Sequence, residues 1–251
     1  MNGSPIGEPI RGQGGAIGAL RYSPDDKQLG VGEETSVWVV DTETWQERQS
    51  LANGFAAYSL AWTDDGARLA AGLGNGKIIV WDSGSWSEAT RLTIDSVDVT
   101  AVAWTPDGKR LVAGSANGAA RLWSSTDWHR DGQDLRGHAN FVVDARFSDD
   151  GRWLATFGGD GAAVLWDVEL HRQLGASLVG SPNEFGGVWM APDAGRLLTY
   201  QADGSIWDWP LDDNNWMNRV CSVAGRDLTE DEWTTYAPGL QVSSICPDPS
   251  Q

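Results

Sequence analysis

The sequence has few basic residues and no long apolar run. It contains 18 Lys and Arg against 35 Asp and Glu in 251 residues, which gives a formal net charge of -17. Affinity for nucleic acids and anionic membranes depends on Lys and Arg, so we expect no nucleic-acid partner and no membrane partner. No stretch approaches the length of a membrane span, and residues 1–15 lack the basic start and apolar core of a secretory signal. The sequence therefore predicts a cytoplasmic protein.

Cysteine and histidine are also scarce. Cys221 and Cys246 are too few for a disulfide framework or for a structural zinc site on their own. Reduced thiols are favoured in a cytoplasmic setting, with a bridge between them as the alternative. His129 and His171 have no partner at metal-ligand spacing. We predict no metal and no cofactor.

Glycine and tryptophan are abundant instead, with 31 and 15 copies. Many glycines indicate many tight turns, and tryptophan favours strands, so the composition predicts an all-β chain. Four tryptophans that each end an apolar run are separated by 42, 43 and 43 residues, and Val40 holds this place one period earlier: Trp81, Trp123, Trp166 and Trp209. A second apolar anchor recurs before a turn rich in Asp, Pro and Gly, at Tyr22, Trp62, Trp104, Phe147 and Met190. The chain is thus built from five copies of one unit.

One copy of this unit imitates a phosphate-binding loop. Residues 72–82 read GLGNGKIIVWD, but Ala71 stands where the loop needs its first glycine and Ile78 stands where it needs a hydroxyl. The same register holds GSANGA at 114–119, so the stretch is a repeated hairpin turn. It predicts no nucleotide site.

Each period contains three strands separated by turns and then a more polar fourth segment, such as TWQERQSL at 44–51. Four strands in about forty residues is typical of a propeller blade. Residues 137–167, GHANFVVDARFSDDGRWLATFGGDGAAVLWD, resemble the WD-repeat family in their Gly-His, their aspartate turn and their closing Trp-Asp. The resemblance implies a WD-repeat β-propeller of five four-stranded blades over residues 1–210. Residues 211–251 are predicted to form a short α-helical hairpin.

The resemblance also implies a buried hydrogen-bond chain in each blade. In this family a His, a Ser or Thr, an Asp and a Trp form it, and the fourth repeat offers all four: His138, Thr156, Asp160 and Trp166. The other repeats carry Gln13, Asn53, Asp95 and Ser181 at the His position. Because the register places the four inside a blade, we expect a structural role and no catalytic one.

A further set of tryptophans, Trp45, Trp86 and Trp128, recurs at separations of 41 and 42. They either pin each outer strand to its blade or line one face as anchors for a partner. On the inner strands, Asp144 and Arg146 are the charged groups we expect. One carboxylate is too few for the converging site of a propeller hydrolase or lyase.

The two ends of the sequence suggest a context. Residues 8–22 align without gaps on residues 133–147, so the chain begins within an outer strand that either completes the last blade and closes a ring or follows blades of a longer parent. Residues 221–239, followed by Ile-Cys-Pro at 245–247, resemble the C-terminal signature of large bacterial signal-transducing NTPases of the STAND type. In those proteins a WD-repeat sensor follows an NTPase module.

The leading hypothesis is therefore a non-catalytic module that binds a protein ligand, as the sensor end of such an NTPase or a detached relative of one. A propeller enzyme with a channel site and a stand-alone assembly scaffold are the alternatives.

Overall fold

The computed structural model describes residues 9–12, 15–95, 97–180, 186–191, 195–211 and Thr229. These residues form 20 β-strands and no helix, so none of their segments is a helix able to cross a membrane. The predicted helical hairpin at 211–251 lies outside the described residues, apart from Leu211 and Thr229.

Five antiparallel sheets follow one another along the chain, here named sheets I to V. Sheet I contains β1 (Ala19–Tyr22), β2 (Gln28–Gly32), β3 (Ser36–Asp41) and β4 (Glu47–Ala52). Sheet II contains β5 (Ala57–Trp62), β6 (Arg68–Leu73), β7 (Lys77–Asp82) and β8 (Glu88–Thr93). Sheet III contains β9 (Val99–Trp104), β10 (Arg110–Ser115), β11 (Ala119–Ser124) and β12 (Arg130–Arg136).

The last two sheets depart from four strands. Sheet IV contains β13 (Val142–Phe147), β14 (Trp153–Gly158), β15 (Ala162–Asp167), β16 (Arg172–Gln173) and β17 (Leu178–Val179). Its outer strand is split because Gly175 between β16 and β17 adopts a left-handed φ of 64°, which ends an extended strand. Sheet V contains β18 (Gly186–Met190), β19 (Arg196–Gln201) and β20 (Ile206–Pro210). The prediction of five four-stranded blades is therefore met by sheets I to III, while sheet V shows three strands in the described residues.

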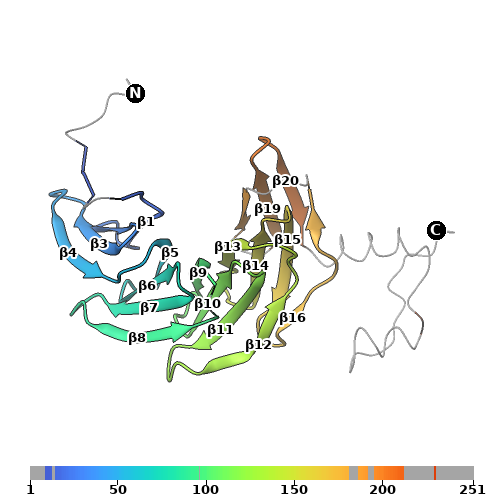
Figure 1. Ribbon diagram of the computed structural model, residues 1–251. Coiled ribbons are helices and arrows are strands. Elements are labelled where there is room, and N and C mark those ends of the chain that lie inside the picture. Colours follow the sequence, from blue (N-terminus) through green and yellow to red (C-terminus); the bar gives the residue numbers. More distant parts are fainter. Residues whose placement is uncertain are drawn as a thin grey trace.

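The sheets stand side by side around an arc, with β1, β5, β9, β13 and β18 as the neighbouring inner strands (Figure 1). The arc is open between sheet I and sheet V in Figure 1. Residues 9–12 add no strand to sheet V, and Gly12 lies against the carboxyl group of Glu33 in sheet I. The described residues of this segment therefore do not show it completing the last blade.

Apolar side chains on both faces of each sheet hold the arc together. We call the face toward the preceding sheet the backward face and the face toward the following sheet the forward face. Successive residues of a strand point to opposite faces, so runs such as Lys77–Asp82 supply both. One buried cluster joins Val37 and Val39 of sheet I to Leu60 and Ile79 of sheet II. Three further clusters join sheets II to III, III to IV and IV to V in the same way.

Glycines on the forward faces let the sheets approach. A Cβ on Gly72 would lie 2.7 Å from Val99 Cγ1, and one on Gly114 would lie 2.5 Å from Val142 Cγ1. Between sheets IV and V the large residue lies on the forward face and the glycine lies on the facing sheet. Phe157 occupies the forward-face position, and a Cβ on the facing Gly186 would lie 2.9 Å from its ring.

The anchor tryptophans add hydrogen bonds between sheets. Trp62 Nε1 donates to the carbonyl of Arg21 at 3.1 Å, and Trp104 Nε1 donates to the carbonyl of Ala61 at 3.2 Å. Each indole therefore bonds to the inner strand of the preceding sheet, which fixes how neighbouring sheets are rotated.

Candidate functional site

The four residues predicted to form a buried chain come together in sheet IV. His138 Nε2 lies 2.7 Å from Thr156 Oγ1, and His138 Nδ1 lies 3.2 Å from Asp160 Oδ1. Trp166 Nε1 donates to Thr156 Oγ1 at 2.9 Å. The second oxygen of Asp160 accepts the backbone N–H of Ala139 at 2.8 Å. The chain thus ties the segment before β13 to β14 and β15.

Burial governs the protonation of this chain. Desolvation lowers the pKa of His138, and the charge and hydrogen bond of Asp160 oppose that effect in part. A neutral imidazole protonated on Nδ1 donates a hydrogen bond to Asp160, and its Nε2 accepts one from the Thr156 hydroxyl. The Thr156 oxygen in turn accepts a hydrogen bond from Trp166 Nε1. Every polar group then has a partner. Thr156 is fully buried, so its hydroxyl has no access to a substrate.

The closing tryptophans occupy equivalent places in their sheets. Trp81, Trp123 and Trp166 are buried, and Trp209 is partly buried against the cluster between sheets IV and V. Trp209 Nε1 donates to Thr199 Oγ1 at 3.1 Å. The sequence analysis did not single out Thr199, although it holds the register position of Thr156 beside its closing tryptophan.

The replacements at the His position make fewer hydrogen bonds than His138 where the structure describes them, and Asn53 Nδ2 is buried without a partner. Asn53 Oδ1 accepts the backbone N–H of Phe55 at 2.8 Å, and Asp95 Oδ2 accepts Asn117 Nδ2 at 3.2 Å. Gln13 and Ser181 lie outside the described residues. Sheet IV alone, among the described residues, therefore has the full His-Thr-Trp chain.

The recurring tryptophans before the outer strands share a constrained backbone. Trp45, Trp86 and Trp128 have φ values of 58°, 56° and 60°, in the left-handed region. Trp86 N–H donates to the carbonyl of Asp82 at 2.7 Å, and Trp128 N–H donates to that of Ser124 at 3.0 Å. A bulky residue persists in this region only when its surroundings hold it there.

Two of these three tryptophans are held by packing. The rings of Trp86 and Trp62 meet edge to face at 5.9 Å, those of Trp128 and Trp104 at 6.1 Å, and the Arg68 guanidinium lies over the Trp128 ring. Trp45 is 46% exposed. Sheet I, which carries Trp45, has no sheet on its backward face among the described residues, so Trp45 lacks the neighbouring sheet that covers Trp128.

The inner strands bring together three charged groups. Arg146 lies 3.4 Å from Asp144 in β13, and the backbone N–H of Val188 in β18 donates to Asp144 Oδ2 at 3.3 Å. The third group, Arg21 of β1, was missing from the sequence analysis, although ALRY at 19–22 contains it. Its Nε donates to the carbonyl of Leu60 at 3.3 Å.

These three charges influence one another. Burial is the main cause that lowers the pKa of Arg21, followed by the charge of Arg146, while Asp144 acts in the opposite sense. Burial raises the pKa of Asp144, and Arg146 opposes it. Asp144 thus pairs with Arg146, and the charge of Arg21 lies near enough to act on both. We call these three residues the inner-strand cluster.

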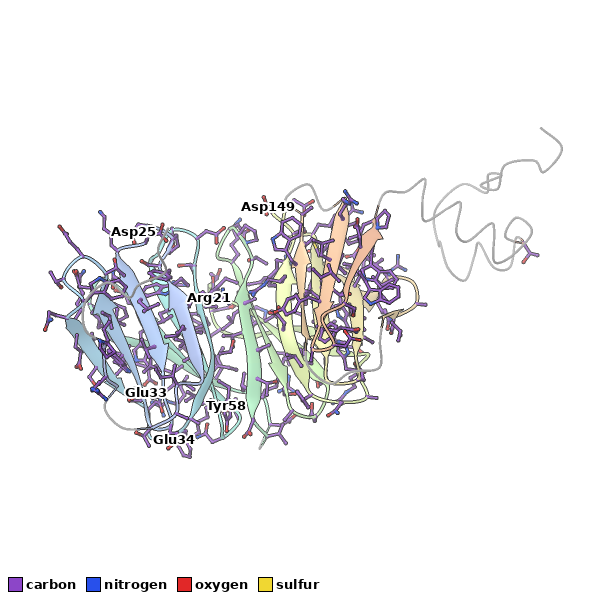
Figure 2. The ribbon with its side chains drawn as sticks, turned by 90° about the horizontal axis from the view of Figure 1, so that it is seen from above. Arg21, Asp25, Glu33, Glu34, Tyr58 and Asp149 are labelled. Carbon is purple, nitrogen blue, oxygen red and sulfur yellow. The ribbon has the colours of Figure 1, made fainter. Side chains whose placement is uncertain are left out.

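Acidic residues lie at both ends of the inner strands. Figure 2 shows Asp25 and Asp149 at one edge of the molecule and Glu33, Glu34 and Tyr58 at the other, with Arg21 between them. Burial raises the pKa of Asp64, and the charges of Asp149 and Asp65 add to this effect. Arg21 of the inner-strand cluster thus lies between acidic residues, in a chain whose formal net charge is -17.

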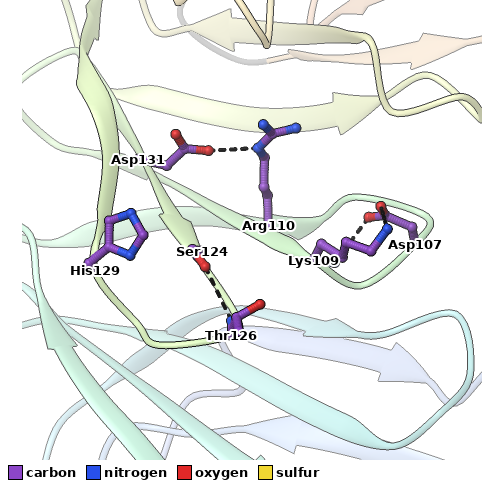
Figure 3. A pocket seen from close by; sticks show the side chains of 7 residues that line it. All are labelled: Asp107, Lys109, Arg110, Ser124, Thr126, His129 and Asp131. Atoms are coloured by element: carbon purple, nitrogen blue, oxygen red, sulfur yellow. Dashed lines mark hydrogen bonds and ion pairs between the residues drawn. The ribbon is translucent and has the colours of Figure 1, made fainter.

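A separate polar hollow of about 400 Å³ lies beside β10 to β12 (Figure 3). Its charges already have partners: Arg110 Nε donates to Asp131 at 2.6 Å, and Lys109 Nζ lies 3.1 Å from Asp107. Such compensated pairs leave little net attraction for a charged ligand. No group of three or more His, Cys, Asp or Glu with metal-binding geometry occurs in the part of the chain that the structure describes.

Comparisons with known proteins agree with this architecture. The family model for the WD domain, G-beta repeat, matches residues 47–82, 89–124 and 129–167. Each match begins near the outer strand of one sheet and ends with the third strand of the next, so one sequence repeat links two sheets. A search of the curated proteins finds no match.

Solved structures show the same fold. The crystal structure of RRP9 WD40 repeats is 19% identical with a TM-score of 0.70, covering 81% of this chain and 62% of that one. The structure of U3-55K is 19% identical with a TM-score of 0.69, covering 80% and 63%. This chain spans less than two thirds of the length of either structure. It carries WD40 repeats, and its described part has the fold of a WD-repeat propeller.

Proposed function

We propose that this chain is a non-catalytic protein-binding module whose ligand places an acidic side chain against the inner-strand cluster. WD40 repeats generally form interaction or scaffold modules. The observation that carries the proposal is the charge of the inner strands: among the described residues they supply Arg21, Arg146 and the single carboxylate Asp144. Two guanidinium groups offer planar, bidentate sites for a carboxylate.

The same observation weighs against a propeller enzyme. General acid and base catalysis or a metal site needs several converging carboxylates or histidines, and the described inner strands supply one carboxylate. Metal analysis of the purified protein tests this directly. A stoichiometric bound ion would favour the enzyme hypothesis over the binding module.

The ligand chemistry is testable with a defined probe. Fluorescein-labelled hexaglutamate is titrated at low salt, and anisotropy reports binding. We expect Arg146→Glu to abolish binding. Arg91→Glu is the control, because Arg91 lies on the outer strand β8 and pairs with Glu88 at 2.6 Å. Equal binding by Arg146→Glu and the unaltered chain would contradict a role for the cluster.

We further propose that this module is the sensor end of a bacterial signal-transducing NTPase, or a detached relative of one. The motif at residues 221–239 and Ile-Cys-Pro at 245–247 support this proposal through their resemblance to STAND proteins. Ligand binding would then shift the balance between two arrangements of sensor and NTPase. Translating the source DNA upstream of the Met1 codon tests the context: an in-frame phosphate-loop module would support the sensor of a larger NTPase, and an in-frame stop would support a stand-alone module. An ATPase assay on this chain alone should show no turnover.

A further inference from the structure

Sheet V presents an apolar forward face that no described residue covers. Trp189, Tyr200 and Ile206 on this face are 49%, 52% and 72% exposed. Strand register places Ile206 opposite Tyr200 in β19. The same position in sheets I to IV is taken by buried residues: Val37, Ile78, Ala120 and Ala163. Burial at this position is thus the rule wherever a following sheet is present.

The internal interfaces show what such a face requires. The forward faces of sheets I to IV each pack against apolar side chains of the next sheet, as Phe157 and Leu165 pack with Val188 and Met190. Sheet V carries two aromatic rings and an isoleucine in the corresponding place. An exposed apolar patch of this kind is typical of a surface that is covered in the working protein.

The chain itself continues from this sheet. Leu211 follows β20, donates its backbone N–H to the carbonyl of Gly195 at 2.8 Å, and packs against the cluster that contains Val188 and Leu197. Residues 212–251 follow it, and they include Trp216, Val220, Val223, Leu228 and Trp233. A segment tethered beside a surface has a high effective concentration there, which favours it over a second molecule.

We propose that residues 212–251 dock on the forward face of sheet V, with their apolar side chains over Trp189, Tyr200 and Ile206. The segment takes the place that the next sheet takes in the other interfaces, and so acts as a terminal cap of the repeat array. In this arrangement the end of the arc at sheet V is closed to partners. The surfaces that remain accessible to ligands are then the inner strands and the backward face of sheet I.

The cysteine content provides a direct test. Cys221 and Cys246 are the two cysteines of the chain, and both belong to the proposed cap. Ile206→Cys therefore introduces one thiol on the forward face of sheet V. The full chain is treated with a short bismaleimide at low protein concentration, and peptide mass analysis identifies the linked residues. We expect an intramolecular link between position 206 and Cys221 or Cys246.

Leu20→Cys is the matched control. Leu20 is an apolar residue of β1 that is 58% exposed on the backward face of sheet I. We expect at least a tenfold lower yield of links to the cap from this position. Equal yields from both positions, links formed only between molecules, or no link from position 206 would each overturn the proposal. Links between molecules would instead indicate a second copy on this face.

Hydrogen exchange gives an independent measurement that needs no change in sheet V. The double variant Trp216→Ala/Trp233→Ala removes two large apolar groups from the segment. We expect faster amide exchange in β19 and β20 and unchanged exchange in β10, β11 and β14. Unchanged exchange in β19 and β20 would contradict docking of the segment through these two residues.

Discussion

The imidazole of His138 and the hydroxyl of Thr156 lie 2.7 Å apart in the interior of sheet IV. The Thr156 oxygen also accepts Trp166 Nε1 at 2.9 Å, so one hydroxyl links a loop, a middle strand and a closing tryptophan. His138 and Trp166 both depend on this hydroxyl for a buried hydrogen bond.

Replacing Thr156 by valine keeps the shape of the side chain and removes both bonds. Burial without a partner costs about 1–3 kcal/mol for a polar group, so we expect Thr156→Val to lower the free energy of unfolding by about that amount. Urea denaturation measures it. Thr199→Val is the control, because its partner Trp209 is only partly buried, whereas Trp166 is buried. An equal loss in both variants would show that burial of the indole is not the cause.

His138 should make stability depend on pH. Its folded pKa is lowered by burial, while the unfolded value is about 6.5. Between these two values the unfolded chain holds a proton that the folded chain lacks, so the free energy of unfolding falls as the pH decreases through this window. Urea denaturation from about pH 7.5 to about pH 5, that is from about one unit above to about 1.5 units below the unfolded pKa, measures the slope.

The variant His138→Gln lacks this titration but keeps hydrogen-bonding groups. We expect it to be less stable at neutral pH and to show a smaller fall in stability toward pH 5. A fall as steep as that of the unaltered chain would assign the pH dependence to other groups.

Trp128 and Trp45 should differ in their contribution to stability. Trp128 packs on Trp104 and under Arg68, so Trp128→Ala should cost about 2–4 kcal/mol. Trp45 is 46% exposed, and Trp45→Ala should cost less than about 1 kcal/mol. Thermal unfolding followed by circular dichroism measures both. If Trp128→Ala left stability unchanged and abolished ligand binding, Trp128 would be a partner anchor and not a structural one.

The close approach of sheets III and IV depends on Gly114. A methyl group there would meet Val142 Cγ1 at 2.5 Å, and overpacking of this kind costs about 1–3 kcal/mol. We expect Gly114→Ala to destabilise the chain. The double variant Gly114→Ala/Val142→Ala should lose less than the sum of the two single variants. Strict additivity in urea denaturation would show that the two sites do not compete for space.

Several features were predictable because they depend on local pattern. The recurrence of Trp81, Trp123 and Trp166 predicted the strands and their order, since each apolar run must pair with its neighbours through short turns. The His138, Thr156, Asp160 and Trp166 positions also followed from register within one repeat. Arg21 shows the opposite case. It belongs to the first repeat, and its relation to Asp144 and Arg146 becomes visible only when β1 and β13 occupy the same arc.

The sequence by itself determined the repeat, the all-β class and the acidic charge, because these depend on residue type and on spacing along one strand or hairpin. The tertiary structure decided which faces meet and where the arc stops. Trp45 and Trp128 occupy the same place in the repeat, yet Trp45 is exposed, while Trp128 packs on Trp104 under an arginine of the preceding sheet. Ile206 differs from Ile78 in the same way. Burial depends on the neighbouring sheet in space, and a repeat pattern contains no information on whether that neighbour is present.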